Sequence, residues 1–508
     1  HFLRAKLPDR LVDDFFAFFD VVKAPVAIRS SSLLEDSHYQ PFAGIYSTYM
    51  IPYMEDKYEM LRMLSDAIKG VYASVYYHDS KAYMQATSNV IDQEKMAVIL
   101  QEVVGTQRGD RYYPAISGVA RSLNYYPIGD EKAEEGIVSL ALGLGKYIVD
   151  GGLTLRVCPY HPHQVLQTSE VEIALRETQT QFYALDTKNI GENFSIDDGF
   201  NLLKLPVKEA ENDGALTFIA STYDPYDMVI RDGIYPGGRK LITFANVLQH
   251  DVFPLAELLQ LAQKYGQEEM RRPIEIEFAV KLNPDRKSTR LNSSHDTATT
   301  EIYTLSLHDA LPIYLLQIRP IVDSKEMLDE DLSQIKDEDT LLRSHNSLGH
   351  GIVTDLQDVV YVKTDHYTPS NNQLIAYDIE KLNRKFLEEG KNYILVGPGR
   401  WGSSDTWLGI PVKWPHISAA RVIVEAGLTN YRVDPSQGTH FFQNLTSFGV
   451  GYFTVNPFRK DGVYDQEYLN SLPAVEETQY LRHVHFDKPL AVKMDGKKNQ
   501  GVVMKPVD

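Results

Sequence analysis

The chain has 508 residues, 43% of them hydrophobic, which allows about two to four globular domains with substantial cores. A formal net charge of −18 excludes nucleic acid and anionic membranes as expected partners, because the electric field of the protein repels both. The single cysteine, Cys158, excludes internal disulfides and multi-thiolate zinc clusters. No apolar run predicts a membrane span and no secretory signal is visible, so we expect a cytoplasmic protein.

The first 75 residues predict two helices with a strand between them. The chain begins at His1 inside a helical pattern, so we expect it to be a fragment of a longer protein. Residues 26–28 predict a strand that delivers Arg29 to a polar turn at residues 30–32. The second helix is predicted by apolar residues at helical spacing after an acidic first turn, namely Leu61, Leu64, Ile68, Val71 and Val75.

Further strands follow along the chain. The nearly continuous apolar run at residues 96–104 predicts a buried strand that exits to a polar edge, and residues 116–120 and 136–142 predict two more. At residues 274–280, apolar side chains alternate with Glu275 and Glu277, so both carboxylates lie on one strand face. A matching strand at residues 314–320, with Leu316 and Ile318 on one face and Leu315, Gln317 and Arg319 on the other, would complete a hairpin. This mixture of helices and strands indicates an α/β (α+β) protein.

The last third of the chain predicts a second unit. Residues 323–340 are acidic and predict a linker, and residues 341–508 predict a second α/β domain. Its strands are expected at residues 359–362, 393–396, 422–424 and 450–455.

Several motifs occur in a fixed order along residues 25–321. They are AIRSSSLLEDS around Arg29, PFAGIYSTY from residue 41, KMAVILQEVV from residue 95, ISGVA from residue 116, IEIE from residue 274 and LQIRP from residue 316. Together they resemble the ATP-binding domain of the phosphoenolpyruvate synthase and pyruvate, phosphate dikinase family. The resemblance implies an ATP-grasp-like fold for residues 1–322. Each motif alone is weak, because a strand-ending arginine or a Glu-x-Glu strand usually faces solvent.

The resemblance also implies roles for individual residues. Arg29 and Arg319 correspond to arginines that meet ATP phosphates and are the expected catalytic cations, while Glu277 and Gln317 correspond to ligands of Mg²⁺. ATP and Mg²⁺ are therefore the expected cofactors. The expected nucleotide-binding residues are Arg29, Gly44, Thr48, Gln101, Glu102, Val104, Glu275, Glu277, Gln317 and Arg319.

Two features depart from the family. Its glycine- and lysine-rich segment, with a phosphate-binding lysine, would lie before His1. Where many members read GLGE, this chain reads GLGK, so Lys146 replaces an acid and the corresponding contact is redirected or lost.

A segment between the two strands of the predicted hairpin resembles translated sequencing adapter. Residues 285–295 read DRKSTRLNSSH and residues 303–313 read YTLSLHDALPI, which match the translated ends of common library adapters. We expect residues 286–313 to be an artefactual insert in which His295 and His308 carry no chemistry. The alternative is an ordinary polar surface loop. Without the insert, Glu277 and Gln317 are separated by an even hairpin spacing.

The second unit resembles, less closely, the swivelling phosphohistidine domain of the same family. The sequence SQGTHFF places His440 where the family has its phosphorylated histidine, before an expected short helix whose dipole would favour a phosphate. The alternative is a structural histidine at a strand–helix junction. The motif GPGRWGSSDTW, residues 397–407, either binds an anion or uses Arg400 to stack on Trp401 or Trp407.

A further group of possible ligands is Cys158, His161 and His163. Because no fourth ligand is nearby in the sequence, we favour a proline-punctuated loop over a metal site here.

We therefore expect an ATP-dependent phosphotransferase, or kinase, module that transfers phosphoryl from ATP to a histidine, with His440 as the best candidate. Pyruvate, phosphoenolpyruvate or another phosphoacceptor would be the further partner. The alternative is an ATP-binding regulatory sensor without turnover. A chain interrupted in its metal-binding hairpin could itself be inactive.

Overall fold

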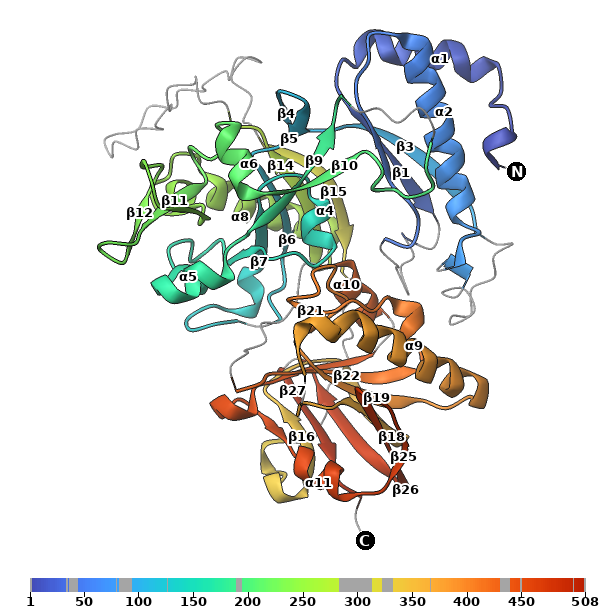
Figure 1. The fold of residues 1–508 in the computed structure, drawn as a ribbon, viewed down its shortest axis with the longest axis vertical. Helices are drawn as coiled ribbons and strands as arrows, with labels where there is room; N and C mark the ends of the chain where they lie inside the picture. Colours follow the sequence, from blue (N-terminus) through green and yellow to red (C-terminus); the bar gives the residue numbers. More distant parts are fainter. Residues whose placement is uncertain are drawn as a thin grey trace.

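The computed structural model describes residues 2–32, 35, 44–78, 80–81, 94–125, 127–188, 194–282, 313–321, 332–365, 367–429, 439–447, 450–496 and 498–506. Helices and strands are mixed throughout these residues, and the strands form several sheets, which confirms the predicted α/β (α+β) class. In Figure 1, the sheet of the last third of the chain lies below the sheets formed by the first two thirds. None of the helices in the described ranges combines the length and apolarity needed to cross a membrane.

The N-terminal sheet, ordered β2–β1–β3, is covered by two helices. Its elements are α1 (Arg10–Val21), β1 (Val26–Ser32), β2 (Tyr49–Ile51), α2 (Lys57–Ser74) and β3 (Met96–Glu102). Phe19 of α1 and Leu64 of α2 pack in one core with Val26 and Ile28 of β1. The Asp56 carboxylate accepts hydrogen bonds from the first backbone N–H groups of α2, which explains where that helix begins. Both predicted helices are confirmed.

Two predictions about this sheet are wrong. The expected turn at residues 30–32 is strand, because the three serines continue the antiparallel ladder with β3, from Ser30 opposite Val98 to Ser32 opposite Met96. Strand β3 is also not buried. It lies at the edge of the sheet, its residues alternate between partial burial and exposure, and Ile99 is 47% exposed. An apolar run therefore marks an edge strand here, in contrast to the usual pattern.

The central region contains two main sheets and a smaller one, ordered β15–β14–β6–β7–β8, β10–β9–β5–β4 and β12–β11–β13. Its strands are β4 (Thr106–Arg108), β5 (Arg111–Tyr113), β6 (Ile116–Arg121), β7 (Ile137–Ala141), β8 (Leu155–Val157), β9 (Gln181–Asp186), β10 (Leu202–Pro206), β11 (Ala220–Asp224), β12 (Val229–Asp232), β13 (Arg239–Ile242), β14 (Ile274–Val280) and β15 (Ile313–Pro320). Its helices are α4 (Lys146–Val149), α5 (Val171–Glu177), α6 (Val207–Asn212), α7 (Ala245–Leu248) and α8 (Leu255–Met270). A shared core joins the sheets and α8.

The C-terminal region is built on a large sheet, ordered β17–β23–β22–β19–β18–β26–β27–β16–β24, with β25 paired to β26. Its strands are β16 (Thr340–Ser344), β17 (Asn346–Leu348), β18 (His350–Val362), β19 (Tyr393–Pro398), β22 (Ala420–Ala426), β23 (Gly451–Val455), β24 (Val463–Tyr464), β25 (Ala474–Glu477), β26 (Leu481–Asp495) and β27 (Gln500–Met504), and β20 (Arg400–Trp401) pairs separately with β21 (Gly409–Ile410). Its helices are α9 (Asn372–Glu389), α10 (His440–Ser447) and α11 (Gln466–Ser471).

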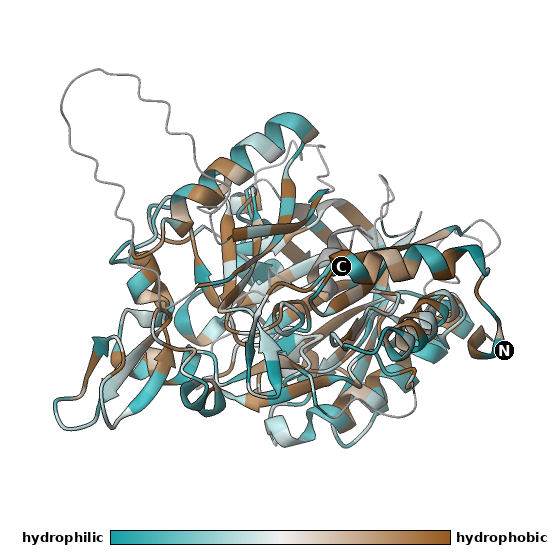
Figure 2. Cartoon of the chain, turned by 90° about the horizontal axis from the view of Figure 1, so that it is seen from above, coloured by the Kyte–Doolittle hydropathy of each residue, from teal (hydrophilic) through white to brown (hydrophobic). Residues whose placement is uncertain are grey.

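Strands β18, β19, β22 and β23 run parallel, and α9 and α10 pack in one core on the same side of them. The four strands predicted in this region are confirmed. Sequence patterns missed β26, because the exposed residues 487–489 interrupt its alternation of buried and exposed positions. Figure 2 shows that the helices carry both hydrophilic and hydrophobic residues, as expected for elements that cover sheets.

The structure describes the predicted acidic linker, residues 323–340, only in part. Residues 322–331 lie outside the described ranges, while η6 (Leu332–Gln334) and η7 (Asp337–Asp339) lead into β16. Leu332 is buried, and the Arg343 side chain of β16 donates to the Asp337 carboxylate at 2.8 Å. The other 3-10 turns are η1 (Phe2–Arg4), η3 (Ala133–Glu135), η4 (Leu166–Thr168), η8 (Pro369–Asn371), η9 (Trp414–His416) and η10 (Pro457–Arg459).

The contact between β6 and β14 gives a test of core packing. Gly118 lies opposite Phe278, and a Cβ atom at Gly118 would approach Phe278 Cζ to 2.1 Å. Since Phe278 is buried, we expect Gly118→Ala to lower the free energy of unfolding by about 1–3 kcal/mol, measured by denaturant titration. Gly145→Ala is the control, because its Cβ would lie 3.8 Å from Ser117 Cβ; equal losses in the two variants would contradict the packing argument.

Candidate functional site

Arg29 connects four strands of two different sheets, its own strand β1 included. Its position on β1 lies opposite Ile99 of β3, and its guanidinium points toward the β14–β15 hairpin. Arg29 Nη1 donates to Gln101 Oε1 at 3.0 Å, and Nη2 donates to Glu277 Oε2 at 3.1 Å and to Gln317 Oε1 at 2.7 Å. Four residues expected to bind nucleotide or metal, distant in sequence, therefore make direct contact.

The strand register of the hairpin brings its acidic and amide side chains together. Glu277 of β14 lies directly opposite Gln317 of β15, and Val280 lies opposite Ile313. The predicted pairing of the two hairpin strands is thus confirmed on either side of residues 283–312. These residues, which include His295 and His308, lie outside the described ranges. Ile313, the last residue of the adapter match, is the first residue of β15.

A bulge in the ladder changes which side chains face the site. The register shifts between Glu277 and Phe278, so Leu316 has no direct partner on β14. The expected strict alternation of residues 315–319 is therefore wrong: Leu316 and its neighbour Gln317 both line the same cavity, while Ile318 is 38% exposed.

These side chains surround a cavity of about 190 Å³ between the N-terminal sheet and the hairpin. Of the expected nucleotide-binding residues, the cavity is lined by Arg29, Gly44, Thr48, Gln101, Glu277, Gln317 and Arg319. Six further lining residues were not in the expected set, although all lie in or beside the motifs of the resemblance; they are Ser30, Ser31, Glu35, Tyr46, Ile99 and Leu316. The lining thus combines two arginines, two carboxylates, hydroxyl groups and aliphatic side chains.

The loop that carries Gly44 is described only in part. Residues 36–43 lie outside the described ranges, and Gly44 has a φ of 70°, a backbone conformation that favours glycine. The Tyr46 side chain is buried, and its hydroxyl donates to Glu94 Oε2 at 2.5 Å. Burial, followed by the Glu94 carboxylate, raises the Tyr46 pKa far above its ordinary value, so this hydroxyl stays protonated.

Glu275 does not line the cavity. Its side chain is 2% exposed and lies between Arg121 of β6 and Arg319 of β15. Arg121 Nε donates to Glu275 Oε2 at 2.7 Å, and Arg319 donates to Glu275 Oε1 from Nε at 3.0 Å and from Nη2 at 2.7 Å. The carboxylate therefore fixes the orientation of Arg319 at the cavity wall.

The charges around Arg319 keep it cationic. Burial alone would lower the Arg319 pKa, but the carboxylates of Glu275 and Glu277 outweigh this effect and the pKa is raised. Arg121 had not been singled out in the sequence. Its position directly after the ISGVA motif is the one signal in the sequence that could have indicated it. Its pairing with Glu275 is visible only in the register of β6 against β14.

The other expected nucleotide-binding residues lie outside the cavity lining. Glu102 is exposed at the end of β3, and Val104 follows that strand. Lys146, the residue that departs from the family pattern, lies 3.5 Å from Asp150 and 3.7 Å from Asp198. Burial lowers its pKa, but these two aspartates reverse the effect and raise it.

His440 is the first residue of α10, which confirms the predicted short helix; its side chain is not among those described. Thr439 caps the helix, because its hydroxyl accepts from the Phe442 N–H at 3.0 Å. The Phe442 ring lies 5.2 Å from the Arg121 guanidinium and 6.0 Å from the Tyr125 ring. Helix α10 therefore contacts Arg121 of β6, the arginine that also binds Glu275, and Figure 1 shows α10 at the junction of the two regions.

The GPGRWGSSDTW motif joins the same two regions. Trp401 is buried in the C-terminal core, where its indole N–H donates to the Val424 carbonyl at 2.9 Å. The Ser404 N–H donates to the Asp150 carbonyl at 3.0 Å, and the Ser403 hydroxyl donates to the Gly151 carbonyl at 3.2 Å. The described contacts of this motif thus stabilise the C-terminal core and link it by hydrogen bonds to the loop after α4.

The mixed α/β fold and the cavity lined by arginines and carboxylates are consistent with a nucleotide-binding protein, and comparison with known proteins specifies its family. Residues 1–340 match the family described as "Pyruvate phosphate dikinase, AMP/ATP-binding domain", and the chain belongs to this family. It is also 28% identical over 149 residues to the "Uncharacterized phosphotransferase YvkC" of Bacillus subtilis (strain 168). That match covers 29% of this chain and only 16% of the relative. These similarities support an ATP-binding role of the phosphotransferase type.

The Glu275 contacts generate a stability prediction. Glu275→Ala leaves two arginines without their shared buried carboxylate, so we expect the free energy of unfolding to fall by about 3–5 kcal/mol in denaturant titrations. Glu277→Ala is the matched control on the same strand, and its more accessible side chain, 18% exposed, should cost about 1 kcal/mol or less. Equal stability losses would show that burial of the Glu275 pairings is not the decisive feature.

Proposed function

We propose that this chain is a Mg·ATP-binding phosphotransferase module that transfers phosphoryl from ATP to a histidine. The observation that carries the proposal is the convergence of Arg29, Glu277 and Gln317 at one cavity, in a member of an ATP-binding family. Phosphoryl transfer depends mainly on positioning and charge neutralisation, and this cavity offers both cations and oxygen donors.

The residues fit the two expected ligands. Arg29 and Arg319 supply fixed positive charge for phosphate oxygens, and Arg319 is already oriented by Glu275. Glu277 and Gln317 supply the carboxylate and amide oxygens that Mg²⁺ accepts, and bound Mg²⁺ would neutralise charge on the transferring phosphate. Ile99 and Leu316 add aliphatic surface on which a nucleotide base could pack.

His440 is the proposed acceptor. An imidazole nitrogen would form the P–N bond while the P–O bond to the departing nucleotide breaks and the electron pair leaves with that nucleotide. Support comes from the position of His440 at the N-terminus of α10, where the helix dipole favours an attached phosphate, and from the packing of Phe442 on Arg121.

Nucleotide binding is tested by calorimetric titration of the chain with ATP in the presence of Mg²⁺. Arg29→Ala should weaken binding by about tenfold or more, since it removes a charge-assisted phosphate contact worth about 1.5–3 kcal/mol. Glu277→Gln should reduce the dependence of ATP affinity on Mg²⁺ concentration. Arg239→Ala, which removes an exposed arginine of β13, is the control and should leave ATP affinity unchanged. If Arg29→Ala also leaves ATP affinity unchanged and Glu277→Gln leaves its Mg²⁺ dependence unchanged, the proposed site is refuted.

The acceptor is tested with γ- and β-labelled ATP, using both the full chain and a chain that lacks residues 286–312. Label on protein that is acid-labile and base-stable is expected, and His440→Ala should abolish it. Label that persists in this variant assigns the acceptor elsewhere. Tight Mg-dependent ATP binding without any protein label in either chain would instead favour the regulatory sensor.

A further inference from the structure

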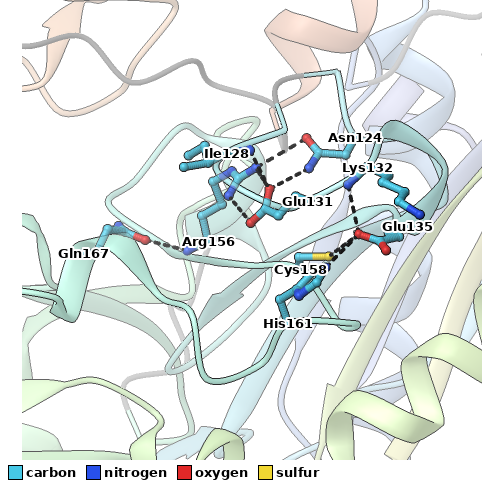
Figure 3. Close-up of polar contacts among 9 residues, drawn as sticks. All are labelled: Asn124, Ile128, Glu131, Lys132, Glu135, Arg156, Cys158, His161 and Gln167. Atoms are coloured by element: carbon cyan, nitrogen blue, oxygen red, sulfur yellow. Dashed lines mark hydrogen bonds and ion pairs between the residues drawn. The ribbon is translucent and has the colours of Figure 1, made fainter.

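Three side chains with metal-binding atoms meet at the edge of the central sheet, away from the ATP cavity (Figure 3). They are Glu135, Cys158 and His161, and one ligand atom from each lies within 4.8 Å of the other two. His161 Nε2 lies 3.0 Å from Glu135 Oε2, and Cys158 Sγ lies 4.0 Å from the same oxygen. The group does not include His163, the third residue suggested by the sequence, and contains Glu135 in its place.

Local backbone structure holds the three side chains in this arrangement. Cys158 follows β8 and begins a tight Cys-Pro-Tyr-His turn, closed by the His161 N–H donating to the Cys158 carbonyl at 2.9 Å. The turn is thus preorganised for a ligand pair three residues apart.

The third side chain comes from the preceding loop. Glu135 is the last residue of η3, and its Oε2 accepts the Lys132 N–H at 2.9 Å, which orients the carboxylate toward the turn. Figure 3 shows Glu135 pointing at both Cys158 and His161. Cys158 is buried, while the side chains of His161 and Glu135 are 24% and 17% exposed, so the group is open to solvent on one side.

We infer that Glu135, Cys158 and His161 form a binding site for one Zn²⁺-like divalent cation, with water as the fourth ligand. Zinc bonds of about 2.0–2.3 Å in a tetrahedron place neighbouring ligand atoms about 3.3–3.8 Å apart. The distances from Glu135 Oε2 to His161 Nε2, 3.0 Å, and to Cys158 Sγ, 4.0 Å, bracket that range, and all three ligand atoms lie within 4.8 Å, so side-chain movements of about 1 Å would bring them to tetrahedral spacing. One thiolate, one imidazole and one carboxylate are a ligand set that zinc accepts.

This site is independent of the proposed ATP site. Strand β8 and strand β15 are the opposite edges of one sheet, four inter-strand steps or about 19 Å apart. Thiolate and imidazole disfavour Mg²⁺, which prefers oxygen ligands, so the two sites select different cations. A cation here would connect the loop before β7 to the loop after β8, and it would stabilise the folded chain.

Cobalt(II) substitution tests the inference, because Cys158 is the only thiol of the chain. The metal-free full chain, titrated with Co²⁺, should show a thiolate-to-cobalt charge-transfer band and visible bands of tetrahedral cobalt, saturating at one equivalent. Zn²⁺ should displace the cobalt and raise the thermal unfolding midpoint. Histidines elsewhere, including those at 295 and 308, cannot produce the charge-transfer band.

Matched variants identify the ligands. Cys158→Ser should abolish the charge-transfer band, and His161→Gln and Glu135→Gln should each weaken Co²⁺ affinity by more than about tenfold, whereas His163→Gln should leave it unchanged. Glu277→Gln should also leave it unchanged, which separates this site from the ATP site. Circular dichroism checks that each variant is folded. Absence of the band in the folded chain, or equal effects of His161→Gln and His163→Gln, would overturn the inference.

Discussion

The carboxylate of Glu275 is the interaction on which the arrangement of the site depends. It is almost fully buried, yet it accepts hydrogen bonds from arginines on both neighbouring strands, so its charge is compensated where an isolated carboxylate would be strongly unfavourable. Through Arg319 it orients one wall of the cavity between the N-terminal sheet and the hairpin. Through Arg121, whose guanidinium also contacts the Phe442 ring, it connects that wall to helix α10 of the C-terminal region. One buried charge thereby couples the register of three strands to the position of the helix that begins with His440.

Sequence patterns predicted the parts of this arrangement that depend on strand periodicity. Alternation on β14 separates Glu275 and Glu277 from the buried Ile274, Ile276 and Phe278, and even spacing predicts Glu277 opposite Gln317 once residues 286–313 are set aside. The bulge was not predictable, since nothing in the run around Leu316 distinguishes an extra residue from regular pairing. The serines after Arg29 favour a turn by local chemistry, and only their pairing with β3 makes them strand.

Long-range contacts explain the rest of what the sequence did not indicate. Tyr46 and Val75 belong to the N-terminal region but pack in the same core as α9 and Trp401 of the C-terminal region. The motif around Trp401 is distinctive because it performs two structural tasks, filling that core and bonding to the loop at Asp150. Neither of these contacts produces a periodic pattern of apolar residues in the local sequence. Likewise, Glu135 joins Cys158 and His161 only because β7 and β8 are neighbours in the sheet.

The two arginines of the cavity differ in what nucleotide binding would require of them. Arg319 is held by Glu275, which lies outside the cavity, so it can meet a phosphate without giving up its partner. Arg29 instead donates to Glu277 and Gln317, the same oxygens proposed to hold Mg²⁺. A guanidinium between these oxygens satisfies them in the free protein, because partly buried acceptors without a donor are costly. Binding of Mg·ATP would then exchange partners. The metal would bind the Glu277 and Gln317 oxygens, and the Arg29 guanidinium would bind the phosphates instead. Such an exchange keeps the charges in the cavity paired both before and after binding, so little free energy is lost to unpaired groups.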